Sequence, residues 1–500
     1  MKKGSISVFL SLILIPVMIL IMTLLESVRY RGLALIIDQA GRAASDSVFA
    51  GYDRILFDKY GLLFYDGSFG LGLTQYERIE EEFGEWFIKN TSFSEGGSFF
   101  ETGYPSVEVT KVIHATDYQG SIFVGSVLKA FPFEKAGDLL NKMKKDLSSI
   151  RKHKKDEPSP IIGPEIPKFP QGYVPKILSA FGRRTLSPEG EKEETDPRKY
   201  EDLLNSGLVG QSKEVRKKGY LSLVIPKGRT ISGNAFKTDE FPSRIAFDDR
   251  ELSSSDFMKD EVKKTIFNEY LMDHFSCFTD GEKEGEGIRY SLEYLVFQED
   301  SDDKNLKKVL DIMLFIRETM NLATIMQSER MRSEVKTLAL GIVGWTGIEG
   351  LVPLAETLIY GAWSYAESLS DLKALLSGNR VPLLKKEDEF YLSLASSGAF
   401  FNGEEEAFGD YKEGLSYKDY LRLFLFTRSL KNLSYAAMDL VQYERSGNDR
   451  AYYMMSQIYA MEFKVEVDSG PLFTTLPFVR SALGIPKDLT IRTWFSESYD

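Results

Sequence analysis

The first 60 residues contain two successive hydrophobic patterns. No charged residue occurs from Gly4 to Leu25, and the stretch Ile6–Leu25 is apolar on every side of a helix. At about 1.5 Å per residue, its length matches the roughly 30 Å hydrocarbon core of a bilayer. Pro16 interrupts the stretch, and we expect it to bend the helix without ending it. The pattern predicts a membrane-spanning helix within residues 1–25, retained because no small-residue cleavage site follows.

Beyond residue 25, the apolar positions recur every three or four residues, which is typical of one face of a helix. They are Leu33, Ile37, Ala40, Ala44, Val48, Tyr52 and Ile55. Asp38 and Arg42 fall on another face with alternating sign. We therefore expect the anchor and the following residues to form one long helix that ends at Gly61. Small residues on this helix leave its partner open: the protein's own fold, or a helix of another molecule.

Strands are few in the rest of the chain. Apolar runs, some of them alternating with polar residues, predict strands at 106–115, 221–225, 289–297 and 463–468. The last is the clearest, because its apolar and charged residues alternate strictly.

Long helices lie between these strands. One predicted helix has the apolar stripe Leu306, Val309, Met313, Ile316, Met320 and Ala323. Another covers 356–378 and ends at Gly378, and a third opens with the capping-box pattern of Ser416 and Asp419. The apolar stretch Leu338–Ile348 is too short to span a bilayer, so we interpret it as a buried helix of a soluble fold.

These elements predict an α+β fold: an N-terminal transmembrane helix that continues into a long helix, followed by a helix-rich mixed ectodomain. Prolines and charged residues concentrate within 141–220, which opposes a packed core there. The predicted segments are the N-terminal transmembrane anchor (1–25), a membrane-proximal long helix (26–65), a mixed α/β region (66–140), a Pro- and charge-rich linker or surface excursion (141–220) and a helix-rich α+β ectodomain (221–500).

The charges that flank the anchor predict its orientation. Lys2, Lys3 and the terminal amine lie on one side, whereas Arg29 and Arg31, offset by Glu26, lie on the other. Cytoplasmic flanks carry the excess of Lys and Arg, so we expect a cytoplasmic N-terminus. The prediction is a single-pass protein of the cell membrane that contacts the bilayer through residues 6–25, with the bulk of the chain extracellular.

The composition of the chain indicates which kinds of molecule it can bind. The 500 residues carry a net charge of −12 and are 43% hydrophobic, which favours a folded ectodomain and opposes nucleic-acid binding. Cys277 is the single cysteine, so an intrachain disulfide is impossible. An unpaired extracellular thiol could cross-link two copies. However, Val262, Ile266, Tyr270 and Cys277 share one face of a predicted helix, so Cys277 is better interpreted as a small core residue. The oligomeric state stays open.

One motif suggests acyl transfer. Ser126 and Lys129 form a Ser-x-x-Lys pattern, and a Ser-Gly-Asn triplet occurs at 232–234, as in serine enzymes activated by lysine. The Lys-Thr-Gly triplet of those enzymes is absent from the sequence, and nothing marks an oxyanion hole. We interpret both patterns as chance matches.

The remaining candidates are weaker still. His274 and Cys277 supply two metal ligands where zinc needs more. The stretch 299–305 begins like a calcium loop, but lacks the glycine and the final glutamate, so Ser301 or Asp302 is better explained as a helix cap. Glu367 and Asp371 lie one turn apart and are interpreted as acids on a helix surface. We therefore assign no catalytic, cofactor-binding or metal-binding residue and expect a protein without enzymatic activity.

Several stretches together resemble a known family. The N-terminal stretch through "AASDSVFAGYDRILFDKYGLLFY", and the blocks "EYLVF", "SDDKNLKKV", "IRETMNL", "AWSYAESLSDLKALLSGNRVPLLK" and "GLSYKDYLRLF", are similar to a family of unknown function. Its members are membrane-anchored proteins associated with the tight-adherence (Tad, or Flp) pilus machinery of Gram-positive bacteria. The N-terminal part is more loosely similar to pseudopilin-like proteins of the same systems. The resemblance implies location and association, but no activity.

The resemblance implies an envelope protein that assists assembly or anchoring of a Tad-type pilus or a related secretion apparatus, with other pilus-assembly proteins as partners. Two alternatives remain: an extracellular cell-wall hydrolase, and a minor pilin that enters the fibre. Pilin precursors are cleaved after a glycine and carry a glutamate five residues later. If Gly4 were that glycine, the fifth residue would be Phe9, which favours a retained anchor.

Overall fold

The computed structural model describes residues 3–91, 100, 102–131, 201–245, 260–281, 287–348, 350–404, 408–409, 411, 413–447, 451–475, 480–481, 484 and 489–499. The fold is α+β, as predicted, with long helices and one small antiparallel sheet. The chain forms two compact units, each assembled from separate stretches. Unit 1 comprises residues 1–131, 239–257 and 437–500, and unit 2 comprises residues 132–238 and 258–436.

Unit 1 combines a sheet with helices. Its helices are α1 (Lys3–Phe49), α2 (Arg54–Tyr60), α3 (Tyr76–Thr91) and α4 (Ser121–Ala130). Its strands are β1 (Tyr65–Asp66), β2 (Ser106–His114), β3 (Gln457–Ser469) and β4 (Leu489–Ser498). The predicted strands at 106–115 and 463–468 are thus confirmed as β2 and part of β3.

Strand β3 is the centre of the sheet. It pairs antiparallel with β2 on one side and with β4 and the short β1 on the other. The register places Phe463 opposite both Val109 of β2 and Phe495 of β4. The apolar residues of β3 therefore lie on one face of the sheet, while the alternating charged residues lie on the other.

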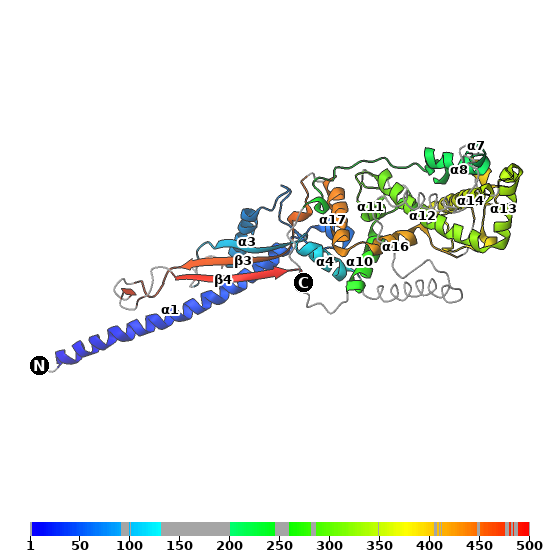
Figure 1. Ribbon diagram of the computed structural model, residues 1–500. Helices are drawn as coiled ribbons and strands as arrows, with labels where there is room; N and C mark the ends of the chain where they lie inside the picture. The colour runs from blue at the N-terminus through cyan, green and yellow to red at the C-terminus, as the bar shows by residue number, and fades with distance from the viewer. Residues whose placement is uncertain are drawn as a thin grey trace, which may run out of the picture. The chain divides into compact units, whose positions relative to one another are not determined.

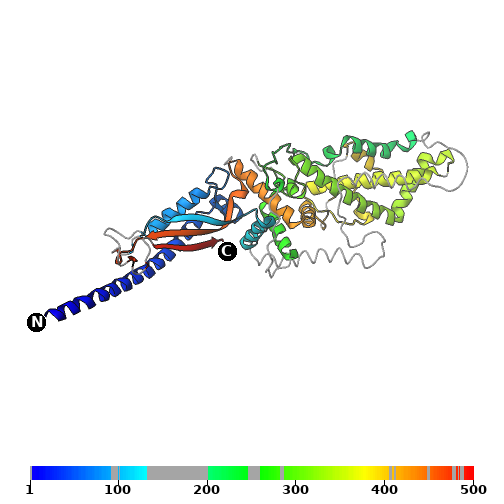
Figure 2. The same ribbon diagram turned by 60° about the vertical axis from the view of Figure 1, so that its left-hand side comes forward.

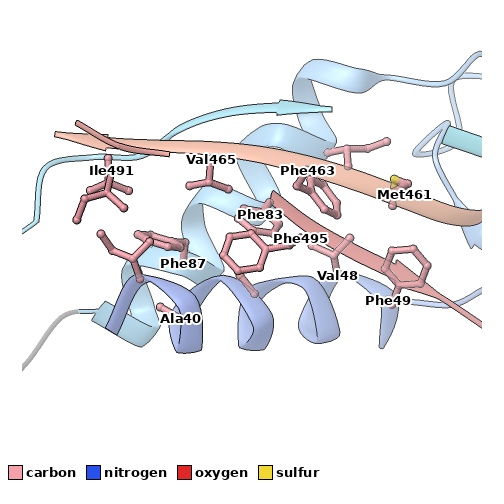
Figure 3. Packing of buried hydrophobic residues seen from close by; sticks show 14 of the residues in the cluster. Ala40, Val48, Phe49, Phe83, Phe87, Met461, Phe463, Val465, Ile491 and Phe495 are labelled. Atoms are coloured by element: carbon pink, nitrogen blue, oxygen red, sulfur yellow. The ribbon is translucent and has the colours of Figure 1, made fainter. Parts of the chain in front are cut away.

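Helices α1 and α3 cover the apolar face of the sheet. Figure 3 shows Ala40 of α1 below Phe87, and Val48, farther along α1, below Phe463. The Phe83 and Phe463 rings stack with their centroids 4.5 Å apart. A Cβ added at Gly41 would lie 2.0 Å from the Phe495 ring, so the small residues of α1 serve close packing on the unit's own sheet. The sequence left open whether this helix packs on its own fold or on another molecule, and the structure shows that it packs on its own fold.

Helix α1 is continuous through Pro16, as predicted, but its end is not where we expected. It ends at Phe49, and Asp53 begins α2 by accepting hydrogen bonds from the backbone N–H of Ile55 (3.0 Å) and Leu56 (3.1 Å). The single helix predicted to reach Gly61 is therefore wrong, and Gly61 instead caps α2 with φ 68°. Periodic apolar positions on both sides of the break concealed it, because α2 continues the same spacing.

Among its described residues, unit 2 contains helices joined by loops, with isolated β-bridges in place of strands. Its helices are α7 (Glu201–Leu204), α8 (Gly207–Lys218), α9 (Leu221–Val224), α10 (Asp260–His274), α11 (Ser291–Phe297), α12 (Asp302–Gln327), α13 (Glu329–Val343), α14 (Leu351–Leu376), α15 (Ser397–Phe401) and α16 (Tyr417–Thr427). The boundary between the units falls within α17 (Leu430–Ser446).

The helices predicted in this unit are confirmed. Gly378, with φ 91°, closes the end of α14, and Ser416 with Asp419 forms the predicted capping box at α16. The prediction of a buried helix over Leu338–Ile348, however, is only partly right: α13 ends at Val343, and it buries Ala339 and Val343 against α14 but leaves Leu340 half exposed.

Two predicted strands are wrong. Residues 221–225 form α9 and a following residue, and residues 289–297 form α11. In α11 every residue from Ser291 to Val296 is buried. A short run that is buried on all sides has no periodicity to distinguish a strand from a helix, and its β-branched and aromatic residues favoured the wrong choice.

Part of the predicted linker lies outside the described residues, namely 141–200. Residues 201–218 form α7 and α8, and α8 packs against α14. The guanidinium carbon of Arg216 lies 3.7 Å from the centroid of the Tyr365 ring, which fixes α8 on the longer helix.

Candidate membrane anchor and buried charge network

The described side chains between Phe9 and Leu25 give this part of α1 an apolar surface. Between Phe9 and Leu25 every exposed side chain that the structure describes is apolar; Phe9 is 64% exposed and Leu12 67%. Figures 1 and 2 show this half of α1 extending away from β3 and β4. Among the described residues, α1 is the one helix long and apolar enough to cross a membrane.

A buried ion pair marks the point where α1 joins the sheet. Arg29 Nη1 donates to Glu26 Oε1 at 2.8 Å, and both side chains are less than a tenth exposed. Arg29 also donates to Ser469 Oγ (2.9 Å) and to the Gly470 carbonyl (3.0 Å), at the end of β3. The other oxygen of Glu26 accepts the backbone N–H groups of Leu472 and Phe473, at 3.0 and 2.7 Å.

These bonds remove two charges from the surface of α1. Glu26 and Arg29 face the β3 end, so the outward residues at this level are Leu25, Ser27 and Val28. The first exposed charge after the apolar half is Arg31. The uncharged outer surface of the helix is therefore about five residues, or roughly 8 Å, longer than the sequence indicated.

Unit 2 contains a second, larger charge network between α12 and α14. Arg317 of α12 is completely buried and donates to Asp371 Oδ2 of α14 through Nε (2.9 Å) and Nη2 (2.7 Å). Its Nη1 donates to the carbonyls of Pro382 (2.6 Å) and Leu383 (2.9 Å). Asn321, one turn after Arg317, donates to the same Asp371 oxygen at 2.9 Å.

Lys385 completes the network from the segment after α14. Its Nζ donates to both Glu367 and Asp371. Glu367 also accepts the backbone N–H groups of Tyr391 (2.9 Å) and Leu392 (2.8 Å). Two cations and two carboxylates therefore neutralise each other, and they fix the segment 382–392 against two long helices.

The pKa directions differ between the two carboxyl groups. Burial raises the pKa of Glu367, which Lys385 partly offsets. Burial would also raise the pKa of Asp371, but Arg317 and Lys385 outweigh it, so that the pKa lies below its ordinary value. The network is closed to solvent, with each charged side chain at most 1% exposed. Such an arrangement orients helices rather than binding a substrate.

Our interpretation of Glu367 and Asp371 as surface acids is therefore wrong. The sequence did contain a signal: Arg317 and Asn321 lie one turn apart, as do Glu367 and Asp371, on helices whose other faces are strongly apolar. Tertiary packing turned both pairs inward. The predicted apolar stripe of α12 is buried from Leu306 to Met313, but farther along the buried positions are Arg317, Asn321 and Thr324.

The Ser-x-x-Lys motif does not assemble a nucleophile and a base. Ser126 of α4 is buried, and its Oγ has no hydrogen-bond partner. Lys129 points to the exposed side of the helix, where Nζ donates to the Tyr459 hydroxyl at 2.8 Å. The Ser-Gly-Asn triplet at 232–234 has a structural role, because Ser232 Oγ donates a hydrogen bond to Asp302 Oδ2 at 2.7 Å.

The other sequence candidates have structural partners. His274 Nδ1 lies 2.9 Å from the Tyr270 carbonyl. Cys277 is buried as predicted, and burial raises the pKa of its thiol to about 12. Its predicted place on a helical face is wrong, because α10 ends at His274. Ser301 occupies the N-cap position of α12, but its side chain makes no capping hydrogen bond. Asn305 Oδ1 instead accepts a hydrogen bond from the backbone N–H of Glu299 at 2.9 Å. No group of three potential metal ligands occurs within the described residues.

Comparison with known proteins places this network within one family. The sequence profile of a family of unknown function (DUF5702) matches residues 198–469. The chain belongs to this family. The DUF5702 match covers every residue of the charge network and continues to the end of β3, whereas α1 lies outside it. No curated protein and no solved structure matches the chain.

Proposed function

We propose that this DUF5702 protein is a single-pass envelope protein, anchored by residues 6–25 and exposed on the outer face of the cell membrane, that assists assembly or anchoring of a Tad-type pilus or related secretion apparatus. The observation that carries the anchor is the apolar, exposed half of α1. An apolar cylinder of this length is unstable in water and needs lipid or other helices around it.

The charges that flank the anchor support the proposed orientation. Lys2, Lys3 and the terminal amine precede the anchor. On the far side, Arg29 is neutralised by Glu26, which leaves Arg31 as the nearest exposed cation. The asymmetry is therefore greater than the sequence suggested, and an excess of cations favours the cytoplasmic side.

The pilus role rests on the resemblance of the N-terminal and helical stretches to proteins associated with Tad pili. A minor pilin is the alternative in which helices of neighbouring subunits, instead of lipid, cover the exposed half of α1. The hydrolase alternative loses its motif, because Ser126 faces the interior and Lys129 the surface.

Protease treatment of wall-stripped cells tests the topology. We expect digestion of most of the chain in intact cells, leaving a protected fragment with the anchor. Protection in intact cells followed by digestion after lysis would reverse the orientation. Mass spectrometry of the mature N-terminus separates anchor from pilin: Met1 or Lys2 supports a fixed anchor, and Ser5 supports processing.

Deletion of the gene tests the pilus role separately. We expect surface pili or adhesion to be lost and to return when the full-length chain is supplied. Normal piliation in the deletion strain would contradict the pilus proposal while leaving the anchor intact.

A further inference from the structure

The loop that follows β3 lies beside the outer end of the proposed anchor. Glu26 is the residue after Leu25, and its carboxylate binds the backbone N–H groups of Leu472 and Phe473. Arg29 holds the start of the same loop through Ser469 and the Gly470 carbonyl. The five polar contacts among these residues place the loop at one defined height along α1, namely that of residues 26–29.

The loop also presents an apolar side chain to its surroundings. Leu472 is 50% exposed, although its own backbone N–H is bound to Glu26. On α1, the face that carries Glu26 continues toward the N-terminus with Met22 and Ile19, which are half-buried, and with Ile15, which is 58% exposed. The exposed Leu472 therefore lies where this apolar face of the anchor ends, and Glu26 and Arg29 are buried against the loop.

We propose that the loop Ser469–Thr474 is a second lipid-contact site, at the boundary between headgroups and acyl chains, and that Glu26 is the residue that positions it there. The inference rests on the proposed anchor. Its occupant is the bilayer, because Leu472 is exposed at the end of an apolar face of the anchor, at the height where the proposed membrane span ends. Unit 1 then rests on the membrane surface, with α1 fixed in depth and rotation.

Labelled cysteines test this contact in the full-length chain. The native Cys277 is buried, so a new surface cysteine will react preferentially with an environment-sensitive fluorophore. We would label Leu472→Cys, Leu14→Cys in the anchor and Thr110→Cys on β2, with the parent chain as background. Each is reconstituted into phosphatidylcholine–phosphatidylglycerol vesicles that contain lipids with a nitroxide at the top of the acyl chain, to report on 472 and 110, and near its end, to report on 14.

Thr110 is a matched aqueous control, because it is exposed on the same sheet near Phe463, about 20 Å along β3 from Ser469. We expect the nitroxide lipid to quench the label at 472 roughly two- to threefold more than the label at 110, since interfacial contacts reach about 5–10 Å into the membrane. In a Glu26→Ala background the quenching at 472 should fall to the level at 110, while the label at 14 stays quenched.

The outcomes separate the inference from the anchor itself. If the label at 14 is quenched and the label at 472 is not, the lipid contact is overturned and the anchor remains. If the label at 472 is shielded from aqueous iodide but is not quenched by the lipid, the loop contacts a protein partner instead. Unchanged quenching at 472 in Glu26→Ala would remove the positioning role. Absence of quenching at both 14 and 472 would overturn the anchor and the inference with it.

Discussion

Unit 1 and unit 2 differ in the position of their buried charged side chains. In unit 1 the space between α1, α3 and the sheet is filled by aromatic and aliphatic side chains, and the Glu26–Arg29 pair lies at its end, beside the anchor. In unit 2 two cations and two carboxylates lie between the helices α12 and α14. A sheet specifies its neighbours through backbone pairing, whereas packed helices can slide or rotate. A buried ionic network gives helices a single register, which is a role attested for such groups in other systems.

Substitution of Asp371 is the strongest way to test this difference. Asp371→Ala leaves Arg317 and Lys385 buried without their shared partner, and we expect a loss of about 3–5 kcal/mol in the free energy of unfolding. Hydrogen exchange should show reduced protection in α12 and α14. Asp303→Ala, on the exposed side of α12, is the matched control and should change little. Equal stability of both variants would show that the network contributes no stability.

The apolar core of unit 1 can be tested at Phe463. Phe463→Ala removes a fully buried ring stacked on Phe83, and should cost about 3–4 kcal/mol through lost burial and a residual cavity. The measurement is hydrogen exchange of the β3 amides. Trp494→Ala on the outer face of the sheet, where the side chain is 57% exposed, should cost much less. A comparable loss for both would mean that the outer face is also covered.

Unit 2 also contains a buried carboxyl without a cation, and this predicts a pH dependence. Burial raises the pKa of Glu293 to about 7, although the Phe278 N–H and the Tyr417 hydroxyl each donate to it. The unfolded carboxyl ionises near 4.5, so between these values the folded state holds the extra proton. The free energy of unfolding should therefore fall by about 3 kcal/mol as the pH rises from 4.5 to 7, and stay level above.

Urea denaturation at several pH values measures this effect. Glu293→Gln should remove that part of the slope, whereas Glu329→Gln, exposed in the first turn of α13, should keep it. A slope that survives in Glu293→Gln would assign the titration to another group.

The smallest expected effect concerns helix ends in unit 2. Ser416 accepts a hydrogen bond from the Asp419 N–H, and Ser416→Ala should cost about 1 kcal/mol. Ser301 occupies the same position at α12 without a side-chain cap bond, so Ser301→Ala should cost less than half as much. Thermal denaturation of the two variants gives the comparison. Equal losses would mean that local capping has no part in fixing α16.

Features with local physical causes could be predicted from the sequence. Strand β3 alternates strictly, α14 ends at a glycine in the left-handed region, and α16 begins with a capping box, so each element carries its own signal. Where a segment is buried on all sides, as in α11, the signal disappears and the predicted strand was wrong. The discontinuous assembly of unit 1 has no local signal either, because β2 and β3 are separated by more than 300 residues.

By itself, the sequence determined that an apolar helix opens the chain, that long helices and few strands follow, and that Cys277 is a core residue, because periodicity and the absence of charge act within a few turns of one segment. Only the tertiary structure decided that α1 packs on its own sheet, that Glu26 and Arg29 are hidden beside β3, and that Arg317, Glu367, Asp371 and Lys385 meet. A charged residue on a helix has the same local pattern whether it faces water or an opposite charge, and the choice depends on which distant segment covers it.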